Sequence, residues 1–249
     1  MRLLLTNDDG VYSEGITVLA DALSVLGEVW VVAPDRERNA ISHALTLHRP
    51  LRLTSLSEFC HAVNGTPADC INIGMHYLLP ESPDLIVSGI NKGGNLGNDV
   101  NYSGTVAGAV EGALMGVPSF SISLSAERDF NFKPAAQFAV RLARFIAHNG
   151  LPPQTVLNVN VPDTGGKEIN RYTITTHGTT THTNTIEEKT DPRGFTYYWI
   201  GRKCDNRERY QPDDASDLKA VREKSISITP LHLDRTHHAS FEALMRVTL

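Results

Sequence analysis

Apolar runs and segments with helical spacing alternate along the chain up to Pro162. Each apolar run is continuous rather than alternating with polar residues, and we predict strands at residues 2–6, 28–34, 84–90, 118–124 and 155–161. Strands that are apolar on both faces are typical of a parallel sheet covered by helices on both sides. The pattern therefore predicts an α/β fold.

The segments between these runs predict helices at residues 13–26, 66–79, 105–116 and 134–150. Ser13 stands at the N-cap position of the first helix, and Gly27 follows its last apolar residue. In the second helix, Thr66 is the expected N-cap and Pro67 occupies the first helical position.

The pattern changes after Pro162. Residues 176–194 are polar, residues 195–201 are aromatic and typical of a strand, and residues 225–231 predict one more strand. The tail predicts a short closing helix. We therefore divide the chain into an α/β core at residues 1–162 and a β-rich extension at residues 163–249, which we expect to reach a neighbouring subunit.

Composition narrows the class of protein. The 249 residues are 41% hydrophobic and 20% charged, which is ordinary for a globular protein. The formal net charge is −5 and no long basic cluster is present, so a nucleic-acid partner is not expected. The three cysteines form no Cys-x-x-Cys pair, and no apolar run approaches the roughly 20 residues of a membrane span. We expect a cytoplasmic protein without a membrane partner.

Polar residues follow three of the predicted strands: residues 7–10, residues 34–42 and residues 91–105. In a parallel sheet these loops meet beyond the carboxyl ends of the strands. Asp8 and Asp9 are adjacent and repel each other unless a cation lies between them. Carboxylate and amide oxygens favour a hard cation such as Mg²⁺ or Mn²⁺. The alternative is a capping or turn pair before Ser13.

The glycine-rich loop at residues 91–105 leads into a helix. Ser103, Gly104 and Thr105 bring free backbone N–H groups and two hydroxyls to its start, which suits a phosphate. The alternative is an ordinary N-cap by Ser103, and the two roles are compatible. A cation beside a phosphate site indicates phosphoryl chemistry. A Gly-x-Gly-x-x-Gly fingerprint and a Walker A loop are absent from the sequence, which disfavours a dinucleotide enzyme.

These residues resemble the SurE family of survival-protein nucleotidases. The segments that carry the resemblance, in chain order, are "NDDGV", "VVAPDRERN", "NGTPADC", "SGINKGGNLGNDVNYSGTVAGAVEGALMGVPSFSIS", "LNVNVP", "DPRG" with "YYWIG", and "SITPLHLD". The resemblance implies a Rossmann-like parallel-sheet domain whose C-terminal β-rich extension is exchanged between subunits of a homodimer or homotetramer. It implies metal-dependent hydrolysis of nucleoside 5′- and 3′-monophosphates, with polyphosphate as a further substrate.

The resemblance also implies roles for individual residues. The expected metal ligands are Asp8, Asp9, Asn39 and Asn91, and the expected phosphate contacts are Asn95, Ser103, Gly104 and Thr105. Asn39 stands where the family commonly has serine. An amide oxygen can bind a hard cation as a hydroxyl can, and Ser42 offers a hydroxyl nearby.

Two mechanisms remain open at this point. A metal-activated water can attack the phosphate, or Asp8 can act as a nucleophile through an aspartyl-phosphate. The alternative functions are a broad acid phosphatase or exopolyphosphatase, and a catalytically silent nucleotide-binding regulator. His43 is a candidate acid–base helper because it follows the second loop closely.

Overall fold

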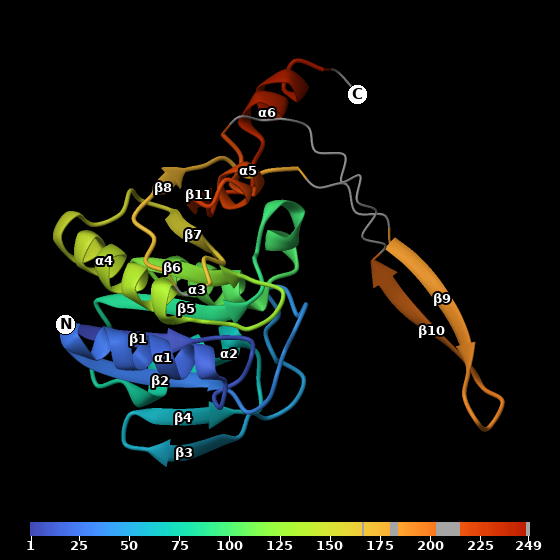
Figure 1. Ribbon diagram of the computed structural model, residues 1–249, viewed down its shortest axis with the longest axis horizontal. Coiled ribbons are helices and arrows are strands. Elements are labelled where there is room, and N and C mark those ends of the chain that lie inside the picture. The colour runs from blue at the N-terminus through green and yellow to red at the C-terminus, as the bar shows by residue number, and fades with distance from the viewer. Residues whose placement is uncertain (166, 180–183, 203–214, 248–249) are drawn as a thin grey trace.

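The computed structural model of this protein describes residues 1–165, 167–179, 184–202 and 215–247. Its main sheet has the strand order β3-β4-β2-β1-β5-β6-β7-β11-β8 (Figure 1). The bounds are β1 (Arg2–Thr6), β2 (Glu28–Pro34), β3 (Leu53–Ser57), β4 (Cys60–Val63), β5 (Leu85–Lys92), β6 (Ser119–Ser125), β7 (Thr155–Pro162), β8 (Tyr172–Ile174) and β11 (Ile226–His232).

The centre of the sheet is parallel, as the apolar runs predict. Strands β4, β2, β1, β5, β6 and β7 pair in parallel. The chain moves outward from β1 to β2 and later returns to the other side of β1 as β5, so the strand order reverses between β1 and β5. Toward its two ends the sheet differs from the prediction, because the edge strand β3 pairs antiparallel with β4, and β11, next to the edge strand β8, pairs antiparallel with β7. The fold is therefore α/β and Rossmann-like, with a mixed sheet.

Helices cover both faces of the sheet. They are α1 (Glu14–Leu23), α2 (Pro67–Ile73), α3 (Gly104–Leu114) and α4 (Lys133–Asn149). Helix α5 (Asp217–Arg222) packs beside β7 and β11, whereas α6 (His238–Leu244) buries none of its residues. Alternate residues of β1 enter different cores. Leu3 and Leu5 belong to the apolar cluster that includes α1 and α4, whereas Leu4 belongs to the cluster that includes α2. This two-sided burial explains why the strand is continuously apolar.

The helix ends confirm one predicted cap and correct two details. Thr66 Oγ1 accepts from the Asp69 N–H at 3.1 Å, and Asp69 Oδ2 accepts from the Thr66 N–H at 2.9 Å, so the second helix begins with a capping box. That helix is α-helical only to Ile73 and continues as a π-helical turn over Gly74–Leu78. Ser13 precedes α1, but its side chain caps no helix N–H. Its Oγ instead accepts from Asn7 Nδ2 at 2.7 Å.

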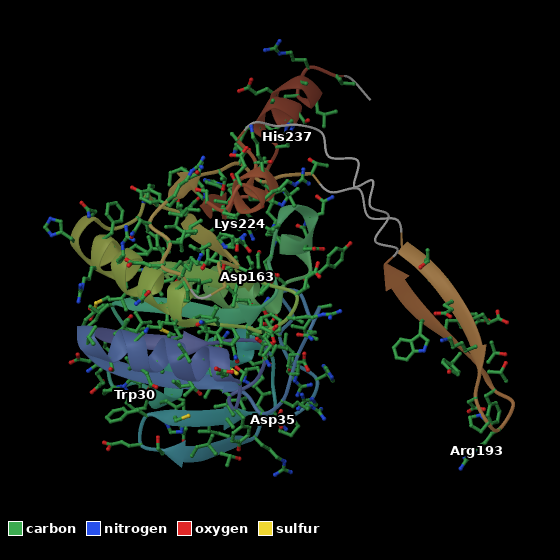
Figure 2. The ribbon with its side chains drawn as sticks, viewed as in Figure 1. Trp30, Asp35, Asp163, Arg193, Lys224 and His237 are labelled. Carbon is green, nitrogen blue, oxygen red and sulfur yellow. The ribbon has the colours of Figure 1, made fainter. Side chains whose placement is uncertain are left out.

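The chain beyond Pro162 adds to the same sheet and forms a separate hairpin. Strands β9 (Asn184–Thr190) and β10 (Thr196–Arg202) pair antiparallel and lie to one side of the sheet in Figure 1. Strands β8 and β11 extend the sheet beyond β7, and Lys224 Nζ donates to Asp163 O at 2.8 Å; both residues are labelled in Figure 2. The predicted strand at residues 195–201 and the closing helix are confirmed.

The hairpin exposes large apolar side chains. Phe195, Trp199 and Ile200 are 68%, 60% and 75% exposed.

Among the described residues, no helix combines the length and apolar character that crossing a membrane requires.

Candidate metal and phosphate site

The three polar loops meet at the carboxyl ends of β1, β2 and β5, as expected from a parallel sheet. The Arg38 N–H donates to Asp8 O at 2.7 Å, which joins the second loop to the first. The Lys92 N–H donates to Asp9 Oδ2 at 3.0 Å, and the Thr105 N–H donates to Asp8 Oδ2 at 3.0 Å. The first loop is therefore hydrogen-bonded to both others, at the place where the strand order reverses.

A tight turn turns the chain at the end of β1. Asn7 Oδ1 accepts from the Gly10 N–H at 3.1 Å, while Asn7 Nδ2 donates to Gly10 O at 3.1 Å. Gly10 has a φ of +96°, and a Cβ there would lie 3.1 Å from the carbonyl carbon of Arg36. Glycine is needed for both reasons. The turn lets Asp8 and Asp9 lie at one edge of the sheet instead of on its opposite faces.

Asp8 lies against the start of α3. Its side chain accepts from the Thr105 N–H and from the Thr105 hydroxyl, and the residue is only 4% exposed. Burial raises the pKa of Asp8 above its usual range, and the hydrogen bonds from Thr105 oppose that rise. Without a bound cation, the Asp8 carboxylate is therefore shielded from water, and a nearby cation would favour its charged form.

Asp9 shares this environment. Burial is the largest cause that raises the pKa of Asp9 to about 6, and the charge of Asp8 adds to the rise. The hydrogen bond from the Lys92 N–H acts in the opposite direction. Two adjacent carboxylates whose charged forms are both disfavoured are a donor pair suited to a divalent cation.

Amide oxygens are available to complete an all-oxygen donor set. Asn91 is 9% exposed, and its Nδ2 donates to Gly93 O at 2.8 Å, so its Oδ1 is the atom left for a ligand. Asn39 is exposed, and its Nδ2 donates to Glu37 Oε1. Among the described residues, no cluster of three His, Cys, Asp or Glu side chains could hold a metal ion. The candidate ligand set therefore consists of two carboxylates together with amide oxygens. Such a set fits Mg²⁺ or Mn²⁺.

The start of α3 differs in one respect from the predicted anion site. Ser103 Oγ accepts from the Val106 N–H at 3.1 Å, so Ser103 is an N-cap. The expectation of free N–H groups is wrong for Thr105, because its N–H is bonded to the Asp8 carboxylate. Gly104 is essential to this approach, since a Cβ there would lie 2.9 Å from Asp8 Cβ. The helix N-terminus already attracts one anionic group.

Asn95 anchors the loop to the sheet beneath it. Asn95 Nδ2 donates to Ser123 Oγ at 2.9 Å, and the Asn95 N–H donates to Asn160 Oδ1 at 2.7 Å. Asn95 O accepts from Asn158 Nδ2 at 2.8 Å. Its contact with phosphate stays a prediction. A signal for these partners is present in the sequence, because two asparagines interrupt the apolar strand "LNVNVP".

The C-terminal extension holds the same loop through a group that we call the Gly97 clamp, formed by Gly97, His177 and Asp217. Asp217 is fully buried, and its Oδ2 accepts from the Gly97 N–H at 2.9 Å. His177 Nε2 donates to Gly97 O at 2.7 Å. Sequence reasoning missed the clamp because residues 201–223 present no apolar face. Ser216, whose side chain caps α5, was the available signal.

A cavity of about 280 Å³ lies beside the start of α3. The polar residues that line it are Ser42, His43, Asn101, Ser103, His177, His232 and Arg235. The cavity borders the N-cap of α3, so it has room for the organic group of a phosphate ester whose phosphate lies at that N-cap.

Comparisons with known proteins agree on one family. The family model described as Survival protein SurE matches residues 3–184. A protein of Pelobacter propionicus named 5′-nucleotidase SurE is 53% identical over 245 residues, which cover 98% of each chain. A protein of the same name from Geobacter sulfurreducens is 50% identical over 245 residues, covering 98% of this chain and 92% of its own. The crystal structure of the SurE protein from Aquifex aeolicus superposes with a TM-score of 0.86 at 38% identity, with 98% of both chains covered.

Proposed function

Because this chain belongs to the Survival protein SurE family, we propose that it is a 5′-nucleotidase that hydrolyses nucleoside 5′- and 3′-monophosphates with a divalent cation. The observation that carries the proposal is the pair of adjacent, desolvated carboxylates Asp8 and Asp9, of which Asp8 accepts hydrogen bonds from Thr105 at the N-terminus of α3. The relatives' name supports the nucleotide substrate. The cavity beside Ser103 supports a substrate larger than phosphate.

In this proposal Asp8, Asp9, Asn39 and Asn91 hold the cation. A divalent ion held by these residues would supply Lewis-acid polarisation of a phosphoryl oxygen and would favour ionisation of a water molecule near neutral pH. The start of α3 would favour a phosphoryl group beside it through the positive end of its helix dipole and the Ser103 hydroxyl, because the N–H groups of Thr105 and Val106 are already bonded within the protein.

Attack by water is favoured over an aspartyl-phosphate. Thr105 donates to both carboxylate oxygens of Asp8, to one through its N–H and to the other through its hydroxyl. Each hydrogen bond lowers the nucleophilicity of the oxygen that accepts it. Asp8 is therefore better suited to holding a cation than to attacking phosphorus.

Phosphate release tests the function directly. A panel of nucleoside 5′- and 3′-monophosphates and polyphosphate is incubated with Mg²⁺, with Mn²⁺ or with excess chelator. We expect release from the mononucleotides that the chelator abolishes. Faster release from polyphosphate than from any nucleotide would favour the exopolyphosphatase alternative. Nucleotide binding without release under any condition would favour the silent regulator.

Cation binding is expected to stabilise the fold in a pH-dependent way. A ligand at about 100 times its dissociation constant adds about 2.7 kcal/mol, or roughly 5–10 °C in melting temperature for a chain of this size. The pKa of Asp9 rises on folding from 3.8 to about 6, so its stabilising contribution without metal is full below pH 4 and lost as the pH passes 6. The cation competes with that proton. We therefore expect the cation to raise the melting temperature at pH 7.5 and to raise it little at pH 5.

Differential scanning fluorimetry with and without Mn²⁺ measures this increase. Asp9→Asn should reduce it at pH 7.5, whereas Asp21→Asn on the outside of α1 should leave it unchanged. An equal increase at both pH values, or an undiminished increase in Asp9→Asn, would argue against the assigned ligands.

Asn39→Ser is expected to be tolerated, with kcat/KM for a mononucleotide changing by about threefold or less. The side chain is exposed, its visible hydrogen bond goes only to the neighbouring Glu37, and a serine hydroxyl is also an oxygen ligand. Steady-state kinetics with Mg²⁺ and Mn²⁺ separately would show a changed metal preference. A loss of activity with both ions would mean that the amide is required by the geometry of this site.

We further propose that the β9–β10 hairpin is exchanged between subunits of a homodimer or homotetramer. The support is the exposure of Phe195, Trp199 and Ile200, because large apolar groups on a hairpin favour contact with another chain. Sedimentation analysis at micromolar concentration tests the proposal, and a monomer under these conditions contradicts it.

A cytoplasmic location remains part of the proposal, supported by the free thiols of Cys60 and Cys70.

A further inference from the structure

A carboxylate is buried halfway along α3, where the neighbouring residues are small and apolar. Glu111 is 8% exposed, and both of its oxygens have partners. Its Oε1 accepts from Asn72 Nδ2 at 2.6 Å, and its Oε2 lies 2.5 Å from His43 Nε2. A buried charge is costly unless it is paired, so this arrangement needs a reason beyond packing.

The segment that carries His43 is hydrogen-bonded to the glycine-rich loop at residues 91–105. The Ser42 N–H donates to Tyr102 O at 3.0 Å, and Ser42 Oγ donates to Asn101 O at 2.8 Å. His43 and Ser103 line the same cavity of about 280 Å³. The imidazole is therefore held at the wall of the space that adjoins the start of α3.

We propose that His43 is the general acid that protonates the sugar oxygen as it leaves phosphorus, and that Glu111 and Asn72 are positioning residues for it. This inference rests on the proposed nucleotidase function. A carboxylate accepts hydrogen bonds, so the proton on Nε2 points to Glu111 and Nδ1 is the nitrogen that exchanges a proton with substrate.

The proposed step balances as follows. Water oxygen forms a bond to phosphorus while the bond between phosphorus and the sugar oxygen breaks. The bonding electron pair leaves with the sugar oxygen, which takes the proton from Nδ1 and becomes a hydroxyl. Of the two protons of the attacking water, one stays on the phosphate product and the other passes to solvent, and Nδ1 regains a proton from solvent.

Glu111 is the charged group that holds the His43 ring in place. The hydrogen bond from His43 is the largest cause that lowers the pKa of Glu111, so Glu111 remains a carboxylate at neutral pH. Asp69 of α2 also acts on Glu111. The other charged or titratable groups at the cavity are His177, His232 and Arg235. Only Glu111 is hydrogen-bonded to His43 among the contacts of the described residues.

Two substrates with different leaving groups separate this role from all others. The alkoxide of a nucleoside leaves poorly without a proton, whereas p-nitrophenolate leaves readily without one. For His43→Asn we expect kcat for a nucleoside 5′-monophosphate to fall about 10²–10³-fold, which is the usual contribution of a general acid. We expect kcat for p-nitrophenyl phosphate to change less than about threefold. His148→Asn, at the exposed end of α4, is the matched control and should change neither value.

Glu111→Gln tests the positioning role by its pH profile. Without the carboxylate the imidazolium loses its partner, so the alkaline limb of kcat for the nucleotide should move to lower pH by about one unit. The profile for p-nitrophenyl phosphate should not move. Thermal melts confirm that each variant is folded, and if His43→Asn does not fold, the Glu111→Gln profile decides the question.

Three results would overturn the inference. One is an equal loss of kcat on both substrates, and another is a raised KM for the nucleotide with kcat unchanged, which assigns His43 to binding alone. The third is an unmoved pH profile in Glu111→Gln. Failure of the unaltered protein to release phosphate from any nucleotide is a separate result, because it contradicts the proposed function and removes the leaving group that His43 would serve.

Discussion

Asp8→Asn is expected to lower kcat for a nucleoside monophosphate on the order of 10³-fold at saturating divalent cation. Asp8 is the residue through which the three loops connect, since it is bonded to Arg38 through its carbonyl and to Thr105 through its carboxylate. The amide keeps the shape of the side chain but removes the charge that attracts the cation. Phosphate release at a series of Mn²⁺ concentrations distinguishes weaker binding of the ion from slower chemistry.

Loss of folding is excluded by a melting curve without metal. Because burial raises the pKa of Asp8, its charged form is disfavoured in the folded protein, and the asparagine variant should melt at a temperature no lower than that of the unaltered protein at pH 7. Asp21→Asn is again the control. Substantial activity of Asp8→Asn at saturating metal would contradict both the water mechanism and the aspartyl-phosphate mechanism.

Gly104→Ala is expected to cost about 10²-fold in kcat/KM, the usual effect of displacing one charge-stabilising group. The added methyl carbon would lie 2.9 Å from Asp8 Cβ, 3.0 Å from Asp8 Oδ2 and 3.0 Å from Ile41 Cγ2. Asp8 must therefore move away from the helix N-terminus, which separates the candidate cation ligand from the candidate phosphate cradle. Kinetics and the Mn²⁺-induced change in melting temperature should both be impaired.

Gly108→Ala in the same helix provides the comparison. A Cβ at Gly108 would lie 2.7 Å from Thr6 Cγ2 and 2.8 Å from Ser88 Oγ, so it disturbs the packing of α3 on β1 and β5. We expect this variant to be destabilised but to keep its response to Mn²⁺. If the two variants lose activity and cation response equally, the effect of Gly104→Ala comes from general distortion of the helix.

The elements that the sequence predicts well are those with a continuous apolar run or a full helical period. Strands β1 and β2 have the predicted bounds, because nearly all of β1 and the last four residues of β2 are buried on both faces of the sheet. The β3–β4 hairpin was missed because β3 lies at the sheet edge and four of its five residues are exposed, so it shows no apolar pattern. Helix α5 was missed because it is short and lies in a charged stretch of sequence. Its buried residues are Asp217 and Ala220, which form no apolar pattern.

The candidate site follows the same division. The oxygen-rich loops could be located because a parallel sheet brings the ends of its strands together. The partners within the site could not, because Asp8 and Thr105 are 97 residues apart and His43 and Glu111 are 68 apart. A side chain's type shows what it can bind, but only the packing of α3 against the first loop shows that Asp8 occupies the helix N-terminus.

The Gly97 clamp has a consequence for the order in which the protein becomes active during synthesis. The loop that carries Asn91 and Ser103 is translated well before His177 and Asp217, which hold it at Gly97. Strand β11, which pairs with the outer edge of β7, is translated later still. Domains usually fold as units while the ribosome is still extending the chain. Here the nascent chain up to Pro162 emerges with β7 unpaired on one edge and its glycine-rich loop unclamped, so we expect hydrolytic activity to arise only once β11 has left the ribosome.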